Sequence, residues 1–475
     1  MKIKVIKMVW KIVKVVLLFL VIGLLFFDIL LPLFTRESDP AWEEKMAQTE
    51  FESDTLGTER ILCIDENEEA LLWRLRMIGN AKKSIVLATF DLRLDENGTK
   101  LMAAVYRAAE RGVQVQLLID GIYEPVFLHR NELFLTLAAH ENIEIRIYNP
   151  ITLSGLFRVN YRMHDKYLIV DDEMYLLGGR NSNDIFLGDK QSGINVDRDI
   201  LVYETLPESG ESMAELLDYF SQIWEESCVR EVRVKEGKLS EEVLRKAREK
   251  FLECYEECLT NDPEMETYCD WEEATYAADK ITLISNGTHA GRKSPRVLSA
   301  IRSLAVKGED VLIQTPYVIC NQFMYDTLRD ISKNADLRII LNTVEKGSNP
   351  WGCTDYLNHR EDILSAGATV YELMNEHAMH TKTVLVDDHI SIVGSYNLDM
   401  RSTYLDTELM LVIDSEELNL HIREMAEEYM EKSRAVYSDG TKEEGILYQG
   451  KELSEKKQLI YQVLRVVTRF VRHLL

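Results

Sequence analysis

Two ten-residue stretches of the chain repeat one pattern of reactive side chains. The first, M-H-D-K-Y-L-I-V-D-D, covers residues 163–172, and the second, M-H-T-K-T-V-L-V-D-D, covers residues 379–388. Both continue to a glycine and an asparagine, and both fit H-x-K-x-x-x-x-D-x-x-x-x-x-x-G-[GS]-x-N. The residues that carry the pattern are His164, Lys166, Asp171 and Asn181 in the first copy and His380, Lys382, Asp387 and Asn397 in the second.

Each copy brings together groups that suit chemistry at phosphorus. A histidine and a lysine two positions apart in a strand point to the same side. A turn at the paired aspartates and a returning strand bring the asparagine back beside them. Lysine and asparagine can then bind the non-bridging oxygens of a phosphoryl group, where the transition state carries its charge. A histidine can attack phosphorus or transfer a proton.

The presence of two copies predicts a shared site. One histidine cannot easily act as both the nucleophile and the acid for the same leaving group, whereas two histidines can divide these roles. We therefore expect one active site at the interface of two halves, with one histidine from each. A single H-x-K could arise by chance, but two complete copies with glycine and asparagine in register make coincidence negligible.

The segments that precede the two copies predict the elements that position them. In the first half we expect a strand, an amphipathic helix and a strand from K-S-I-V-L-A-T-F, G-T-K-L-M-A-A-V-Y-R-A-A-E-R-G and V-Q-V-Q-L-L-I-D. The second half repeats this order in D-V-L-I-Q-T-P-Y, N-Q-F-M-Y-D-T-L-R-D-I-S-K-N and D-L-R-I-I-L-N. Apolar runs without alternation suit strands buried on both faces, and helical crossovers imply parallel pairing. The chain is thus predicted to hold two duplicated α/β domains, at 61–225 and 276–434.

The N-terminal segment, residues 1–35, is predicted to be a membrane anchor. Its first 14 residues carry five lysines and no acid, and the following run from Val15 to Phe34 has only Asp28 as a charged residue. About 20 apolar residues span a bilayer as a helix. Lysines before the run and acids after it place the N-terminus in the cytoplasm. We expect a single-pass protein of a bacterial-type cell membrane, with a linker at 36–60 and the catalytic body outside the cytoplasm.

Two further segments lie outside the predicted domains. Residues 226–275 read as a helical acidic insertion. Residues 435–475 form a basic amphipathic tail, which could lie in a membrane interface or, with equal weight, dock on its own domain. Its apolar stripe comprises Leu459, Ile460, Val463, Leu464, Val467, Phe470, Val471 and Leu474, and Arg465, Arg469 and Arg472 lie opposite.

Composition narrows the class of protein. The net charge of −25 disfavours a non-specific nucleic-acid binder, because an acidic surface repels phosphate backbones. The seven cysteines contain no C-x-x-C pair, and no cluster has metal-ligand spacing, so we expect neither a metal nor a cofactor. A disulfide among Cys228, Cys254, Cys258 and Cys269 stays open if this region lies outside the cytosol.

The paired motif resembles that of the phospholipase D superfamily over roughly residues 60–434. This resemblance implies a two-step, metal-independent reaction through a covalent phosphohistidine, with His164 as the expected nucleophile. It makes Asp171 and Asp387 structural. In D-T-E-L-M-L-V, Glu408 stands where the carboxylate that orients the second histidine is expected, and in V-D-R-D-I-L-V, Asp199 is its counterpart for the first half.

Longer strings are similar to those of bacterial cardiolipin synthases, among them R-G-V-Q-V-Q-L-L-I-D and G-S-Y-N-L-D-M-R-S-T-Y-L-D-T-E. The usual pattern has Asn where Asp406 stands, so one polar contact is expected to differ. The resemblance implies transfer of a phosphatidyl group to phosphatidylglycerol at a membrane bilayer, with phosphatidylethanolamine as an alternative donor. The acidic charge and the predicted anchor favour lipid substrates over nucleic acid. The alternatives are a phospholipase D that hydrolyses headgroups, a nuclease or other phosphodiesterase of the superfamily, and a membrane scaffold with a decayed site.

Overall fold

The computed structural model describes residues 39–475 except 189–193, 207–208, 236 and 268, together with positions 10, 11, 14, 23 and 30. Apart from these five positions, the predicted membrane anchor at 1–35 lies outside the described residues. Among the residues that are described, no helix combines the length and the apolar character needed to cross a bilayer.

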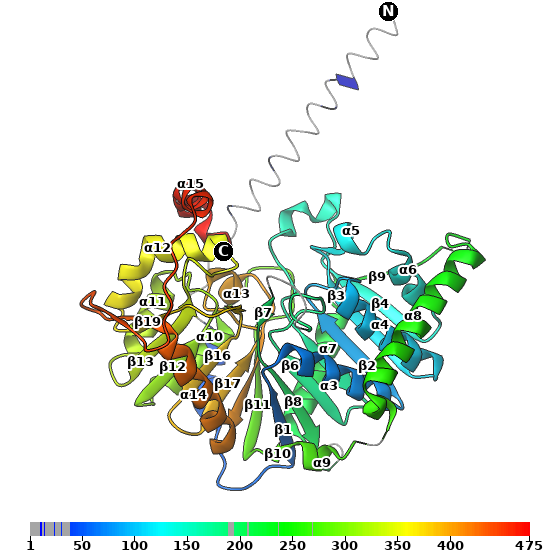
Figure 1. The fold of residues 1–475 in the computed structure, drawn as a ribbon, viewed down its shortest axis with the longest axis horizontal. Helices are drawn as coiled ribbons and strands as arrows, with labels where there is room; N and C mark the ends of the chain where they lie inside the picture. The colour runs from blue at the N-terminus through cyan, green and yellow to red at the C-terminus, as the bar shows by residue number, and fades with distance from the viewer. Residues whose placement is uncertain are drawn as a thin grey trace, which may run out of the picture.

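The body consists of two α/β lobes, each built on a nine-stranded sheet (Figure 1). From edge to edge, the first sheet comprises β10 (Tyr276–Ala277), β1 (Glu59–Ile64), β8 (Asp199–Glu204), β6 (Met174–Gly178), β5 (Tyr167–Val170), β2 (Ser84–Thr89), β3 (Gln114–Asp120), β4 (Ile143–Tyr148) and β9 (Arg230–Glu231). The second comprises β11 (Lys280–Ser285), β18 (Leu409–Asp414), β17 (Ile390–Gly394), β16 (Thr383–Val386), β12 (Asp310–Gln314), β13 (Asp336–Asn342), β14 (Thr369–Leu373), β19 (Ser433–Val436) and β20 (Lys442–Glu444).

The two sheets have the same strand order, which confirms the predicted internal duplication. From β1 to β9 the first sheet matches the second from β11 to β19, strand for strand. Pairing is parallel from β2 through β3 to β4 and from β12 through β13 to β14, as the predicted helical crossovers require. The remaining pairs within the two nine-stranded sheets are antiparallel, including the motif hairpins β5–β6 and β16–β17. A short parallel pair, β7 (Asn195–Val196) and β15 (Ala378–Met379), joins one lobe to the other.

Helices cover the sheets and connect their strands. The first lobe contains α3 (Asn67–Asn80), α4 (Glu96–Glu110), α5 (Glu124–Phe127), α6 (Glu132–Ala138), the 3-10 helix η2 (Leu153–Arg158) and α7 (Glu211–Trp224). Between the lobes in sequence are α8 (Glu241–Asn261), η3 (Pro263–Glu266) and α9 (Trp271–Ala274). The second lobe contains α10 (Arg296–Ala305), α11 (Gln322–Ile331), α12 (Pro350–Ser365), α13 (Met400–Tyr404), α14 (Glu416–Glu431), α15 (Glu455–Val471) and η4 (Arg472–Leu474), and α2 (Pro40–Gln48) packs on α10.

An apolar core joins the two lobes. Buried side chains of both sheets, such as Ile200 and Leu411, belong to one cluster together with Leu216 of α7 and Ile422 of α14. Each lobe has a further core of its own on the other face of its sheet. Because burial of apolar surface is the main stabilising contribution, this shared core holds the lobes in a fixed relation. Residues from the two lobes can therefore build one site.

The segment predicted as a helical insertion is helical over Glu241–Asn261, and this helix packs on α4 and α6 of the first lobe. Its buried face includes Phe251 and Tyr255, while most of its charged side chains are exposed. All seven cysteines are free thiols, including the four whose state the sequence leaves open.

Candidate active site

The motif aspartates fix the turns of the two hairpins. Asp171 adopts a left-handed conformation with φ 57°, and its carboxylate accepts hydrogen bonds from the backbone amides of Lys82 (2.8 Å), Lys83 (2.6 Å) and Ser84 (2.9 Å). In the second lobe, Asp387 has φ 50°, and its carboxylate accepts from the backbone amides of Glu309 (2.8 Å) and Asp310 (3.0 Å). These contacts hold each turn against the start of the neighbouring strand, at the end of the hairpin away from the histidine. The placement agrees with a structural role.

Each motif histidine contacts a carboxylate from the opposite lobe. His164 Nδ1 lies 2.9 Å from Glu408 Oε1, and His380 Nδ1 lies 2.6 Å from Asp197 Oδ2. Backbone bridges between the lobes position both pairs. The His164 amide donates to Thr407 O at 3.3 Å, and the His380 amide donates to Val196 O at 2.7 Å. Each lobe therefore supplies the carboxylate that contacts the histidine of the other lobe. We call this arrangement the exchange of carboxylates, and the interface between the lobes the seam.

This exchange corrects two expectations from the sequence. Glu408, expected beside the second histidine, contacts the first. Asp199, expected to orient a histidine, contacts neither; it is fully buried and accepts from Arg74 (2.9 Å) and Arg180 (3.1 Å).

The strand register explains why Asp197 takes the place expected for Asp199. Gly178 is paired with Asp199 in the first sheet, whereas the equivalent Gly394 is paired with Met410 in the second. Asp199 is thus equivalent to Met410, and the equivalent of Glu408 is Asp197. Side chains two positions apart share a strand face, so the sequence pattern alone does not separate Asp197 from Asp199.

The two lysines are buried beside the histidines. Lys166 donates to the backbone oxygen of His164, and Lys382 Nζ lies 2.7 Å from His380 Nδ1. Burial lowers the pKa of Lys166 to about 7, with the Lys382 charge adding to the effect and the Glu408 carboxylate opposing it. Burial likewise lowers the pKa of Lys382 to about 8, against the attraction of Asp197. An anion placed between two such ammonium groups is favoured electrostatically.

The motif asparagines are also suited to a ligand. Asn181 and Asn397 are buried, and within the described part of the chain their Oδ1 atoms have no hydrogen-bond partner. Buried polar groups are normally paired, and an incomplete one calls for an explanation. The unpaired Oδ1 can accept from a hydroxyl of a bound substrate while the Nδ2 group of the same amide donates to a phosphate oxygen, which provides one.

Three residues that the sequence analysis did not single out pack around the histidines. The Phe90 ring meets His164 edge to face at 5.2 Å, and Phe186 meets His380 in the same way at 4.9 Å. Asp165, the variable position inside the first H-x-K, accepts hydrogen bonds from Thr407 Oγ1 (2.7 Å) and Tyr219 Oη (2.8 Å). Burial raises the pKa of Asp165 to about 7. The Phe residues belong to neither motif, so motif spacing gave no signal for them.

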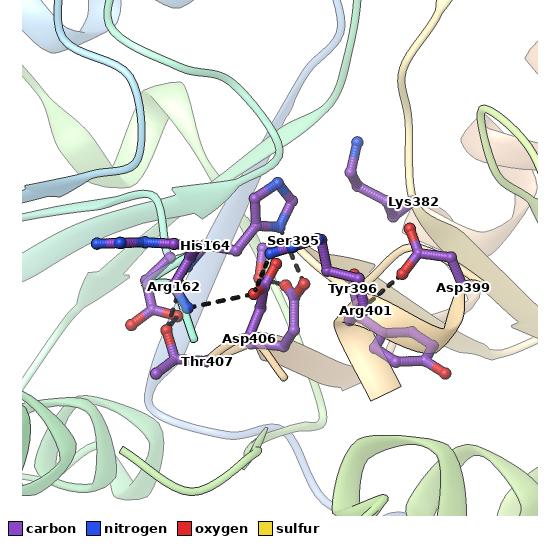
Figure 2. Close-up of polar contacts among 12 residues, drawn as sticks. Arg162, His164, Lys382, Ser395, Tyr396, Asp399, Arg401, Asp406 and Thr407 are labelled. Atoms are coloured by element: carbon purple, nitrogen blue, oxygen red, sulfur yellow. Dashed lines mark hydrogen bonds and ion pairs between the residues drawn. The ribbon is translucent and has the colours of Figure 1, made fainter. Parts of the chain in front are cut away.

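Asp406 stands where the pattern that the sequence resembles usually has Asn, and it forms an ion pair. Its Oδ1 accepts from Arg401 Nη1 at 3.1 Å and from the Arg162 amide at 3.3 Å. Figure 2 shows this network below the imidazole of His164, with the Lys382 side chain pointing to the same side as that imidazole. Arg401 thus compensates the negative charge that distinguishes Asp406 from Asn.

The two carboxylates differ in charge. Burial tends to raise the pKa of Asp197, but Lys382 and His380 outweigh it and bring the value to about 2. Burial raises the pKa of Glu408 to about 8, although Lys166 and a hydrogen bond from Ser395 oppose it. Burial also lowers the pKa of His380 to about 4 and that of His164 well below its ordinary value. At neutral pH the first lobe therefore supplies an ionised carboxylate and the second a largely protonated one.

The two histidines are partly accessible, and charges of both lobes influence each of them. The side chains of His164 and His380 keep 11% and 17% of their surface exposed. Charges cross the seam, because Lys382 lowers the pKa of His164 and Lys166 lowers that of His380. Two imidazoles, two ammonium groups and two amides can thus act on a single phosphodiester.

Comparison with known proteins places this site in a family. The family model described as "Cardiolipin synthase, PLD-like domain" matches residues 75–224 and 301–430. Cardiolipin synthase C of Escherichia coli is 24% identical over 394 residues, which cover 75% of this chain and 81% of that protein. Cardiolipin synthase 1 of Bacillus cereus is 29% identical over 343 residues, which cover 71% of this chain and 60% of that protein. In fold, the chain is similar to the crystal structure of phosphatidylserine synthase from Haemophilus influenzae, with a TM-score of 0.63, 16% identity, and coverage of 92% of this chain and 99% of that one.

Proposed function

This chain belongs to the cardiolipin synthase family with a PLD-like domain, and we propose that it transfers a phosphatidyl group to phosphatidylglycerol through a covalent phosphohistidine. The proposal rests on the contact of each motif histidine with a carboxylate from the other lobe. It gives one site two imidazoles with different partners, as a two-step transfer requires.

In the first step, His164 Nε2 attacks the phosphorus of the donor lipid. A nitrogen–phosphorus bond forms as the bond from phosphorus to the headgroup oxygen breaks. His380 gives its proton to the departing oxygen, and the neighbouring Asp197 carboxylate stabilises the imidazolium before this transfer. The headgroup leaves as a neutral alcohol.

In the second step, His380 removes the proton from the glycerol hydroxyl of phosphatidylglycerol. That oxygen attacks phosphorus, the bond between phosphorus and His164 breaks, and cardiolipin is released. Lys166, Lys382 and the amides of Asn181 and Asn397 hold the non-bridging oxygens, where charge is concentrated in both transition states. No step requires a metal ion.

We also propose the nature of the acceptor alcohol and the location of the protein in the cell. A lipid alcohol reacts in preference to water only where bulk water is excluded, and burial of Lys166 and Lys382 supports such a site. The lysine-rich segment and the apolar run of residues 1–35 support a single membrane-spanning helix with the body outside the cytoplasm. Protease added to intact spheroplasts should then degrade the body, whereas full protection there would mean the inverse orientation.

Lipid analysis of the purified full chain in mixed micelles tests the activity. One mixture contains phosphatidylglycerol alone, and a second also contains phosphatidylethanolamine. Cardiolipin with free glycerol from the first mixture supports self-transfer, and cardiolipin only from the second identifies ethanolamine as the leaving group. Phosphatidic acid as the sole product would replace the proposal by a hydrolase. Degradation of single-stranded DNA without any lipid product, lost in His164→Ala, would replace it by a nuclease.

A further inference from the structure

The C-terminal helix α15 docks on the second lobe with an apolar face turned outward. Leu459, Val463, Val466 and Phe470 follow one another three or four positions apart and so share one face of the helix. All four are exposed, Phe470 at 75% and Val463 at 59%. The sequence leaves open whether this tail lies in a membrane interface or docks on its own domain, and the structure shows docking that leaves this apolar face uncovered.

Other positions of α15 make the contacts with the lobe. Tyr461 Oη donates to Val344 O at 3.0 Å, and Lys457 Nζ donates to Glu345 O at 2.7 Å. Farther along, Arg465 Nε donates to Asn358 Oδ1 at 2.8 Å. These bonds fix the rotation of the helix, so its exposed apolar face is a fixed property of the fold.

The first lobe presents apolar side chains at the corresponding edge. Val126 of α5 is 73% exposed and Leu153 of η2 is 72% exposed, with Phe127 and Phe157 partly exposed beside them. The helices α5 and η2 follow the carboxyl ends of the parallel strands β3 and β4. Figure 1 shows α15 and α5 on the same side of the two sheets.

The motif histidines lie at this same edge. His164 shortly precedes Tyr167, which is paired with Ala88 at the carboxyl end of β2, and β2, β3 and β4 run parallel. In the second lobe, α15 contacts the loop after β13, which is parallel to β12. Thr383, just after His380, is paired with Gln314 at the carboxyl end of β12.

Arg401 ties both apolar elements to the site. Its Nε donates to Leu474 O at 3.0 Å, just after α15, and its Nη1 donates to Asn160 O at 3.1 Å, just after η2. The same Nη1 donates to Asp406 at 3.1 Å, within the network around His164. The exposed apolar residues of α15, η2 and α5 therefore lie at the edge that carries the motif histidines; we call them the apolar rim.

Two observations identify the occupant of the apolar rim. Residues 451–475 carry six Lys and Arg against two Glu, in a chain of net charge −25, so the α15 part of the rim is basic in a chain that is acidic. In addition, the described body begins at Asp39, which forms an ion pair with Arg296 (3.0 Å) at the start of α10. This helix follows β11, whose end is held to the site by the Asn286 amide on Glu408 O at 3.0 Å. The start of the described body thus lies on the side of the second lobe that faces the site.

We propose that the apolar rim inserts into the surface of an anionic phospholipid bilayer and seats the entrance of the active site on the headgroup layer. Apolar side chains with basic neighbours bind such surfaces through burial and charge together. The inference rests on the proposed function for the nature of the substrate. In this position a lipid phosphate reaches Lys166 and Lys382 while its acyl chains remain in the bilayer.

Photolabelling tests the proposal without turnover. The full-length His164→Ala variant is reconstituted into vesicles of phosphatidylcholine and phosphatidylglycerol that contain a trace of phospholipid with a diazirine on its acyl chain. After irradiation, mass spectrometry should find adducts on residues 459–470 and on 126–127 or 151–157. Leu420 of α14, 59% exposed elsewhere on the surface, should carry none. Adducts confined to residues before Asp39, equal labelling of Leu420, or cross-links between two copies of α15 would each overturn the proposal.

A matched pair of variants adds a kinetic test in the active chain. Val463→Asp combined with Phe470→Asp should raise the apparent KM for vesicle substrate by at least about tenfold, because burial of two apolar side chains is lost. Leu420→Asp should leave it unchanged. Both variants should process a dispersed short-chain phosphatidylglycerol at the parental rate. A parental KM on vesicles in the double variant would overturn the proposal, and failure on every lipid by the parent chain would instead refute the proposed function while leaving the labelling result valid.

Discussion

The two halves of the site are alike in backbone but differ in charge. Each provides a histidine, a lysine and an asparagine on the same hairpin, and each lends a carboxylate to its neighbour. Asp197, from the first half, has its pKa brought to about 2, whereas burial raises the pKa of Glu408, from the second half, to about 8. The duplication thus preserved the positions of the groups but not their ionisation.

This difference assigns the roles of the two histidines in the proposed reaction. The ionised Asp197 carboxylate opposes the lowering of the His380 pKa by burial and by Lys382, which favours His380 over His164 as the acid that protonates the leaving group. A nucleophile must be neutral, and burial lowers the pKa of His164 well below its ordinary value. A protonated Glu408 adds little charge to raise it, so His164 is the better nucleophile.

Removal of either histidine should have the largest effect. We expect His164→Ala and His380→Ala each to lower kcat by at least about a thousandfold, since acid–base assistance alone contributes about 10²–10⁴. The two variants should nevertheless differ in rapid-quench experiments, with acid-labile phosphate found on His164 in His380→Ala and none in His164→Ala. Phosphate on His380 would reverse the assignment. Activity should persist in chelator, and strict dependence on added magnesium or zinc would refute the mechanism.

Neutral replacement of the two carboxylates should separate the halves further. Asp197→Asn removes an ionised partner of His380, and we expect kcat to fall by about 10²–10³. Glu408→Gln replaces a largely protonated group by a neutral one of similar shape, and we expect a loss of about tenfold or less. Steady-state kinetics at pH 7 measure both. Equal losses would mean that the two carboxylates carry the same charge.

The pH dependence of kcat/KM should reflect the ionisation of the two motif lysines. A lysine binds the phosphate as its ammonium form, and that form is lost as pH rises above the pKa. With pKa values of about 7 for Lys166 and about 8 for Lys382, kcat/KM should be maximal below pH 7, fall about tenfold per unit between pH 7 and pH 8, and fall about a hundredfold per unit above pH 8. The profile of kcat at saturating lipid should be displaced to higher pH, because a bound phosphate stabilises both charges. A flat profile from pH 7 to pH 9.5 would contradict these roles.

Asp199→Asn should change stability and leave catalysis least affected. Asp199 is buried between Arg74 and Arg180, so its neutralisation leaves two buried cations without their partner and should cost about 3–5 kcal/mol of unfolding free energy. Thermal denaturation measures the loss, with Asp218→Asn on the exposed surface as the control. Folded protein should keep the parental dependence of kcat on pH. An altered dependence of kcat on pH would mean that Asp199 acts at the active site.

The duplicated α/β lobes and the placement of the H-x-K residues on two hairpins could be predicted from the sequence, because both depend on local patterns. Apolar strand runs identified β2, β3, β12 and β13, and spacing within ten residues placed His, Lys and Asp on each hairpin. The carboxylate partners depend instead on which strands meet across the seam. Glu408 lies 244 residues from His164, and the choice between Asp197 and Asp199 follows from the register of β6 with β8. Phe90 and Phe186 reach the histidines through packing alone, which local patterns do not encode.

The exchange of carboxylates also determines when the enzyme can become active. During synthesis, the ribosome releases His164 long before Glu408, and Asp197 long before His380. Neither histidine has its partner until the second lobe has emerged and docked on the first. A nascent or truncated chain therefore carries an incomplete reaction centre, and a chain already held at a bilayer by its N-terminus would leave the surrounding lipids intact until translation is nearly finished.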